Sequence, residues 1–247
     1  MISMTARVAG SSALAAAAQA VSASLIPDEY EARDVSAHPL FVALGAQPVN
    51  LEALWLLVAN MNAGISPNFV RWLASTIARV ADRRVASLMA EQLDDELGNG
   101  DFQNIHSVLL ERFVAGLDRW RPERPGEDLL RAGRRLGARA SLVFEAADPY
   151  DAVGGLIVSE IFAKKMDRCL GAEIRRQNLV PNEALLWLEI HEVLEVDHAE
   201  DSRALALLVP EQEVSRAAAW RGATELWDAM TGFLDDVARL AFREGTA

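Results

Sequence analysis

The segment HEVLEVDHAEDS (residues 191–202) combines two histidines with several carboxylates inside a helical pattern. It belongs to the longer stretch LLWLEIHEVLEVDHAEDSRALALLV (185–209), whose apolar period predicts one long helix. At about 100° per residue, His191, Glu195 and His198 fall within roughly 60° of one another, on a stripe flanked by apolar residues. Burying a carboxylate is costly unless it is paired or binds a metal. This face therefore predicts either a metal site or polar residues satisfied by hydrogen bonds and interhelical ion pairs.

The composition favours an all-α fold, because leucine and alanine dominate and the chain has only two tyrosines. Nothing marks a linker, so we expect a single helical domain over residues 1–247, with residues 1–10 disordered. Proline, glycine and capping residues predict where the helices, about seven or eight in number, begin and end. The expected helices cover residues 11–25, 50–61, 66–97, 104–117, 127–146, 149–178, 181–209 and 211–243, with a connector at 26–48 and no convincing strand.

The net charge of −12 argues against binding to nucleic acid and to anionic membrane surfaces, because both need basic patches. No run is long and apolar enough to cross a membrane, and the alanine-rich stretch 11–25 is too weakly hydrophobic for a signal peptide. We therefore expect a cytoplasmic protein that acts on a small-molecule substrate. The amphipathic last helix, with Trp227 and Leu240 among its apolar residues, could either form a homodimer or cover the core.

Two of the four histidines lie outside the 191–202 segment. His38 precedes Pro39, which disfavours helical geometry at that residue, and we expect it at the surface. His106 lies near the start of an apolar-periodic helix, ten residues after Glu96. In one straight helix these two would be about 15 Å apart. The intervening Gly98–Gly100 break could fold them towards each other; the alternative is a simple helix C-cap with an acidic last turn.

The stretch GGLIVSEIFAKKMDRC (154–169) holds a third candidate, Glu160, which falls in the apolar stripe of its helix. A carboxylate there needs a partner, which is either a metal or one of the many arginines. Lys164 follows one turn later. It either pairs with Glu160 at a spacing of four residues or holds a substrate carboxylate.

Together these helices supply three carboxylates and three histidines without a thiolate. Such ligands suit iron or manganese that activates dioxygen, although zinc remains an option. Six ligands exceed the needs of one metal and suit two. The ferritin-like scheme needs a Glu-x-x-His pair on each of two helices, and here only Glu195 and His198 provide one, so that scheme fits poorly. The candidate metal ligands are Glu96, His106, Glu160, His191, Glu195 and His198.

The segment AEQLDDELGNGDFQNIHSVLL (90–110) resembles the "DE-x-G-x-G, then His" signature of the haem-oxygenase-like di-iron oxidases and oxygenases. Downstream, Glu160 resembles the single glutamate of that family, and residues 191–198 resemble its closing H-x3-D-x2-H motif. The resemblance spans roughly residues 50–210. Glu195 stands where the family usually has aspartate, which leaves open whether Glu195 bridges two metals or binds one.

The resemblance implies a seven-helix haem-oxygenase-like bundle that binds no haem. It implies that the six candidate ligands hold two Fe(II)/Fe(III) ions, with dioxygen as co-substrate. The implied reactions are N-oxygenation, desaturation or oxidative C–C cleavage of a small amine, amino-acid or fatty-acid-like metabolite. Amines and amino acids are preferred here, because the acidic chain and Lys164 could complement both ends of such a substrate.

Three other functions compete with this hypothesis. A true haem oxygenase needs an axial histidine on an early helix, and the only early histidine, His38, precedes a proline. A metal-independent, thiaminase-like hydrolase could use Cys169 as its nucleophile. Cys169 is the only cysteine, so the chain has neither a disulfide framework nor a thiolate metal cluster. No histidine lies close to it in sequence. A non-enzymatic helical binding module would use the polar residues as core pairs and would fold regardless of iron.

Overall fold

The computed structural model describes residues 26–46, 50–125, 127–177 and 182–242, and for residues 177, 182–184 and 192–199 it describes the backbone alone. This part of the chain is all-α, as predicted, with ten α-helices, a short 3-10 helix and no strand. The helices are α2 (Ile26–Glu31), α3 (Pro39–Gly45), α4 (Leu51–Gly64), α5 (Phe69–Arg79), α6 (Arg83–Glu96), α7 (His106–Leu117), η1 (Asp118–Trp120), α8 (Arg131–Phe144), α9 (Pro149–Gln177), α10 (Asn182–Leu208) and α11 (Glu213–Ala241).

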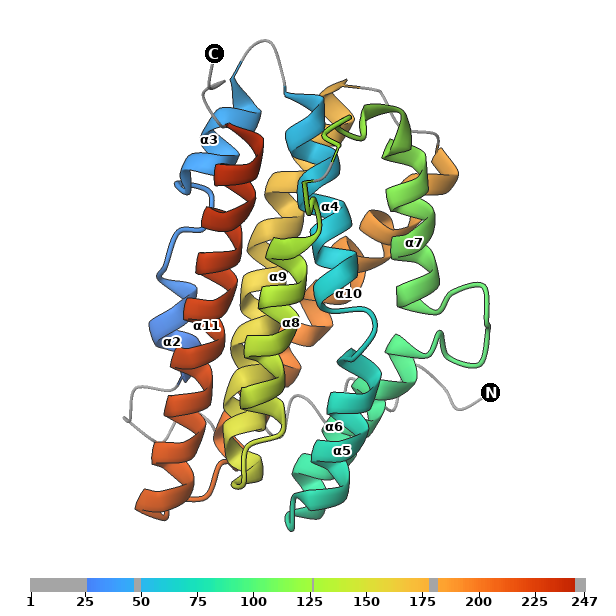
Figure 1. Cartoon of the computed structure of the whole chain (residues 1–247). Helices are drawn as coiled ribbons and strands as arrows, with labels where there is room; N and C mark the ends of the chain where they lie inside the picture. The colour runs from blue at the N-terminus through green and yellow to red at the C-terminus, as the bar shows by residue number, and fades with distance from the viewer. Residues whose placement is uncertain (1–25, 47–49, 126, 178–181, 243–247) are drawn as a thin grey trace.

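The bundle is organised around the long helix α9, which runs through the middle of the molecule beside α8 and α11 (Figure 1). Helices α4 and α7 lie on the other side of this core, and α10 crosses behind them. The antiparallel pair α5 and α6 extends from one end. Residues 97–105 join α6 to α7, and the residues on either side of this junction line one wall of the candidate site.

The helix predicted at residues 66–97 is in fact two helices, so that prediction was wrong in its continuity. Helix α5 ends at Arg79, and Val80 is extended, with φ −71° and ψ 131°. Asp82 then caps α6, because its carboxylate accepts a hydrogen bond from the backbone N–H of Arg84 at 2.8 Å. The Arg84 guanidinium beside it lowers the pKa of Asp82 to about 2. A charged cap of this kind favours a new helix start over a continuous helix.

The connector at residues 26–48 contains two short helices, α2 and α3, instead of the single turn expected. His38 caps α3: its Nδ1 accepts from the backbone N–H of Leu40, so Nε2 is left to donate to Asp235 of α11 at 3.2 Å. Its side chain is only 10% exposed. The predicted surface histidine is thus partly covered by these two contacts, and it caps a helix. The predictions for residues 1–10 and 11–25 lie outside the described residues.

Helices α9 and α11 approach each other closely, because glycines at their crossing have no side chain to separate the two backbones. A Cβ atom on Gly154 would lie 1.8 Å from the carbonyl oxygen of Ala219, and one on Gly222 would lie 1.9 Å from that of Asp151. Arg221 adds two hydrogen bonds to the buried Asp151 carboxylate, at 2.7 and 2.6 Å. The apolar face of α11 is thereby buried within the chain, and the homodimer stays a prediction.

A polar contact fixes α4 against α8. The fully buried Asn60 accepts a hydrogen bond from the backbone N–H of Gly133 and donates one to the carbonyl of Leu129, both at 2.8 Å. These bonds satisfy the start of α8, where the first helical N–H groups lack partners within the helix. They also fix the direction in which Leu136 and Ala140, one and two turns later, face the interior.

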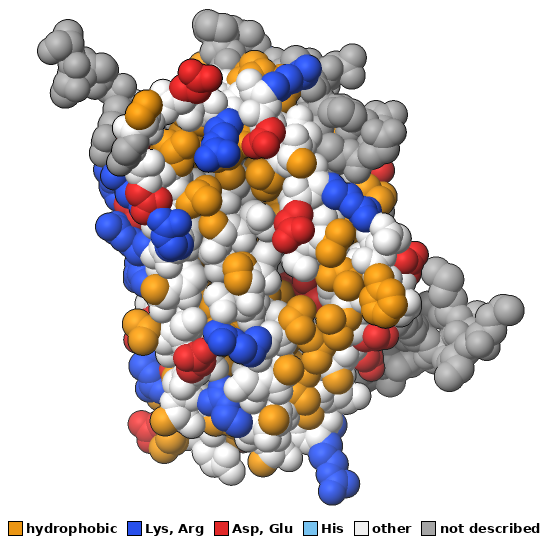
Figure 2. Space-filling view, turned by 45° about the vertical axis from the view of Figure 1, so that its right-hand side comes forward, with side chains coloured by type: hydrophobic (Ala, Val, Ile, Leu, Met, Phe, Trp, Pro, Cys, Tyr) orange, Lys and Arg blue, Asp and Glu red, His pale blue; other side chains and the backbone are white. Residues whose placement is uncertain are grey.

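The surface agrees with the acidic composition. On the face shown in Figure 2, Lys and Arg side chains are interspersed with Asp and Glu, and the described residues form no continuous basic patch there. Among the described residues, no helix has both the length and the hydropathy needed to cross a membrane.

Candidate metal centre

The turn between α6 and α7 brings Glu96 close to His106. Gly98, Asn99 and Gly100 all have left-handed backbones, with φ of 82°, 53° and 84°. A Cβ atom on Gly98 would lie 2.4 Å from the carbonyl oxygen of Asp101, so only glycine fits. The chain reverses here, and Glu96 Oε1 lies 3.1 Å from His106 Nδ1. The Gly-Asn-Gly break thus folds the two side chains together, which was one of the two possibilities left open by the sequence.

His191 reaches the same point from α10. Its Nδ1 lies 2.8 Å from the carbonyl oxygen of Trp187, one turn earlier. Because a carbonyl only accepts, Nδ1 carries the proton and Nε2 keeps the lone pair that a metal needs. The ring centroid of His191 is 4.0 Å from that of Trp187 and 4.7 Å from that of His106. Trp187 in turn stacks on Phe113 of α7, which orients the imidazole.

Glu96, His106 and His191 form a group that fits a metal ion. One ligand atom from each lies within 4.8 Å of the other two. The buried His106 Nδ1 has no hydrogen-bond partner among the described residues. The Glu96 oxygen is near enough, but it does not lie in the direction that a hydrogen bond requires. Lone pairs that converge without bonding one another are what a metal site needs, and two histidines with one carboxylate are typical of non-haem Fe(II) centres.

Two carboxylates of α9 line the same cavity as these three residues: Glu160, which was predicted, and Asp167, which was not given a role. Asp167 is only 1% exposed. It lies seven residues after Glu160, so both fall on one helix face, about 10 Å apart along the axis. That spacing is visible in the sequence and could have marked Asp167 as a second carboxylate facing the site.

The structure says less about the other predicted residues, Glu195, His198 and Lys164. The side chains of Glu195 and His198 lie outside the described residues, and their backbone belongs to α10, one and two turns after His191. Lys164 is half-buried on α9, and it is not among the described residues that line the cavity. The structure therefore brings together Glu96, His106 and His191. It places Glu160 on the wall of the same cavity, outside that group of three, and leaves the predicted substrate contact of Lys164 without support.

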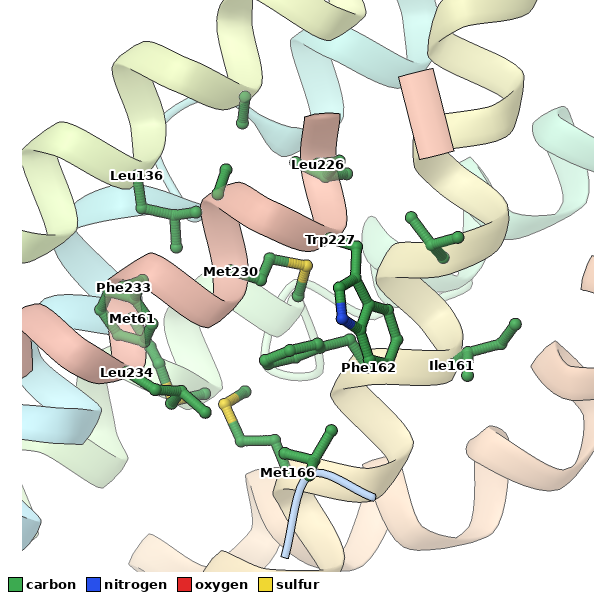
Figure 3. Close-up of a cluster of buried hydrophobic side chains, with 14 of the residues drawn as sticks. Met61, Leu136, Ile161, Phe162, Met166, Leu226, Trp227, Met230, Phe233 and Leu234 are labelled. Atoms are coloured by element: carbon green, nitrogen blue, oxygen red, sulfur yellow. The ribbon is translucent and has the colours of Figure 1, made fainter. Parts of the chain in front are cut away.

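Beside these residues lies a cavity of about 130 Å³ with mostly apolar walls. Figure 3 shows Met61, Met166 and Met230 gathered with the rings of Phe162 and Phe233 between α4, α9 and α11. Among the described residues, no lysine or arginine lines it. Ser66, Ser107 and Ser159 are the neutral polar residues of the wall. The cavity can thus enclose an apolar molecule next to the candidate metal ligands.

Cys169 is also on α9, but it does not line this cavity. Burial, with the nearby carboxylates of Asp34 and Asp167, raises the pKa of its thiol above the ordinary value of 9.0. A nucleophilic cysteine needs the opposite shift, towards the thiolate. The geometry therefore gives no support to the hydrolase that would use this cysteine.

Fold and site together define an all-helical protein with a buried two-histidine, one-carboxylate group next to an apolar cavity. Residues 58–231 match the family of iron-containing redox enzymes, and the chain belongs to that family. The fold is haem-oxygenase-like. It is similar to the crystal structure of a CADD-like protein of unknown function from Nostoc punctiforme, with a TM-score of 0.62 and 14% sequence identity over 94% of this chain and 96% of that one. A comparison with curated proteins found no match.

Proposed function

We propose that this protein is a non-haem di-iron enzyme that uses dioxygen to oxidise a small molecule bound in the apolar cavity. The observation that carries the proposal is the convergence of Glu96, His106 and His191 within 4.8 Å, at the wall of that cavity. Membership in the family of iron-containing redox enzymes supports iron as the metal. Bound iron supplies the redox chemistry with dioxygen that amino-acid side chains lack.

The second iron rests on the remaining candidate ligands. Glu160 lines the same cavity from α9. Glu195 and His198 follow His191 by four and seven residues on α10, the spacing at which helical residues share a face. Six ligands from histidine and carboxylate are more than one iron uses and match a pair. The order of the three motifs along the chain resembles that of the di-iron oxidases, which supports the same conclusion.

The protein's own residues orient and enclose the reaction. Trp187 holds His191 in the tautomer whose Nε2 faces away from the helix backbone. Methionine and aromatic side chains make much of the wall apolar, and an apolar surrounding strengthens electrostatic interactions at the ligands. Since no described lysine or arginine lines it, the carboxylate of an amino acid would find no cationic partner there. This argues against the amino acids preferred from the sequence. It does not argue against the amines preferred with them, because the carboxylates of Glu96, Glu160 and Asp167 line the same cavity.

The test is iron binding under anaerobic conditions, followed by rapid mixing with dioxygen-saturated buffer. We expect two Fe(II) per chain, a transient visible absorption band, and consumption of dioxygen. The His191→Ala variant should keep its helical circular dichroism spectrum and bind less iron. Binding of one Fe(II) would replace the di-iron site by a mononuclear one. No stoichiometric binding, with His191→Ala and wild type alike, would exclude the proposal and favour the binding module.

A further inference from the structure

Trp72 of α5 is a buried hydrogen-bond donor in the wall of the cavity. Its side chain is 1% exposed and lines the same cavity as Glu96, His106 and His191. The indole stacks on the ring of Phe144, with centroids 5.0 Å apart and planes at 3°. Its Nε1 has no hydrogen-bond partner among the residues that the structure describes.

The chain offers a direct contrast in Trp55 of α4. Trp55 is also buried, and its Nε1 donates to Asp118 Oδ1 at 3.1 Å. A buried indole N–H normally has such a partner, because losing its hydrogen bond to water is costly. Trp72 lacks one, and its side chain is part of the cavity wall. An acceptor that enters the cavity would satisfy the N–H and would be selected by it.

The cavity also limits the size and charge of the molecule. Its volume of about 130 Å³ is close to that of the engineered apolar cavity of roughly 150 Å³ that binds benzene. Met61, Met166 and Met230 in the wall are flexible and can adapt to a substituent. The described lining holds no lysine or arginine and includes the carboxylates of Glu96, Glu160 and Asp167, so an anionic group would be buried beside like charges and without a side-chain cation. An uncharged molecule of one ring fits these limits.

We propose that the cavity takes an uncharged, apolar molecule about the size of a single aromatic ring that carries a hydrogen-bond acceptor, and that Trp72 Nε1 donates to this acceptor. This inference rests on the proposed function and deepens it, because it names the class of substrate held beside the metal ligands. Trp72 would then set specificity by rejecting molecules of the same shape that lack an acceptor, since those leave its N–H unpaired.

The test uses the metal-free, full-length chain and two probes of nearly the same shape, acetophenone and α-methylstyrene, of which only the first has a carbonyl acceptor. The six tryptophans give separate indole N–H signals in a ¹⁵N–¹H correlation spectrum, and the Trp72→Phe variant assigns the one from Trp72. Acetophenone should move the Trp72 proton downfield and leave the Trp55 signal in place. α-Methylstyrene should bind at least fivefold more weakly and move the Trp72 signal little.

The Trp72→Phe variant provides a second measurement. In Trp72→Phe, which keeps a ring for stacking, acetophenone should lose about fivefold in affinity while α-methylstyrene keeps its own. Equal affinities of the two probes for the wild type, or an unmoved Trp72 signal, would mean that water satisfies the indole, and would overturn the inference. Failure of both probes to bind up to their solubility would overturn it too. Neither iron nor dioxygen enters these measurements, so their failure is distinct from failure of the proposed function.

Discussion

Glu96, the last residue of α6, and His106, the first residue of α7, face each other with Oε1 and Nδ1 3.1 Å apart. Ten residues separate them in the sequence, and the left-handed turn at Gly98–Gly100 closes that distance. The geometry of this turn therefore determines whether two of the candidate metal ligands can share an ion.

Substituting Gly98 tests that dependence. In Gly98→Ala, the added Cβ meets the backbone of Asp101 and Asn104, at 2.4 and 2.8 Å, so the turn must open. We expect a loss of more than about 2 kcal/mol in unfolding free energy, because the left-handed φ alone costs about 1–2 kcal/mol for alanine. Iron affinity should fall as well. Urea denaturation and anaerobic Fe(II) titration measure the two effects.

Gly100→Ala is the matched control. Gly100 has nearly the same φ, but nothing lies within 4 Å of its Cβ position. Gly100→Ala should therefore lose only the strain energy of the left-handed backbone, about 1–2 kcal/mol of unfolding free energy. Its iron affinity should change little. Equal effects of the two substitutions on iron binding would show that the clash at Gly98 does not control the approach of Glu96 to His106.

A second prediction separates metal ligands from other histidines. His191→Ala should lower the bound iron by at least one ion per chain, because it removes an imidazole from the group of three. His38→Ala removes a histidine that caps α3 and bonds Asp235. It should cost about 1 kcal/mol of stability and leave the iron content unchanged. Iron assays on the two purified variants decide this; identical iron contents would contradict the assignment.

Some of the site could be predicted from the sequence because the information is local. The turn residues between Glu96 and His106 specify a reversal, and the period of α10 places His191, Glu195 and His198 on one face. The boundary before α6 was also local, since Asp82 is a good cap, but the apolar period on both sides concealed it. Each of these features depends on neighbours within about ten residues.

The cavity could not be predicted in this way. Its wall combines Met61 of α4, Leu136 of α8 and Phe233 of α11, and their contact depends on how three helices cross. Crossings are set by side chains on both partners, which no local pattern contains. The unpartnered indole of Trp72 is another example: its sequence context shows an apolar residue on an amphipathic helix, while its missing acceptor is a property of the packed molecule.

The buried thiol yields a prediction about pH. Because burial raises the pKa of Cys169 above 9.0, its thiolate fraction at pH 8 is smaller than that of an exposed cysteine. Alkylation by iodoacetamide at pH 8 should be correspondingly slower than in a cysteine peptide, and should still be accelerating above pH 9. Cys169→Ala should leave dioxygen consumption unchanged. Loss of dioxygen consumption in this variant would show that the thiol takes part in the oxidation, and would contradict the assignment of the reaction to the metal ligands alone.

The two buried tryptophans should differ in what their N–H groups contribute to stability. Trp55→Phe removes a hydrogen bond to Asp118. Because Asp118 is exposed and water can replace the indole there, the loss should be about 1 kcal/mol beyond the change in ring size. Trp72→Phe removes a donor that has no described partner, so only the change in ring size should affect its unfolding free energy. Denaturation of both variants without added ligand measures the difference. Equal losses would indicate that Trp72 also has an acceptor in the free protein.

The crossing of α9 and α11 should be the least tolerant point of the core. A Cβ on Gly154 would lie 1.8 Å from a carbonyl oxygen of α11, and the two helices would have to separate to admit it. Gly154→Ala should lose about 3 kcal/mol or more, at the upper end of overpacking effects. Gly232 of α11 is the control, because a Cβ there lies 3.4 Å from the end of the long Arg139 side chain and not from backbone. Gly232→Ala should gain up to about 1 kcal/mol from helix propensity. Helix α9 also carries Glu160 and Asp167. Separation of the two helices at Gly154 should therefore weaken iron binding, whereas Gly232→Ala should leave iron binding unaltered. A destabilised Gly154→Ala variant that binds iron normally would show that the metal centre does not depend on this crossing.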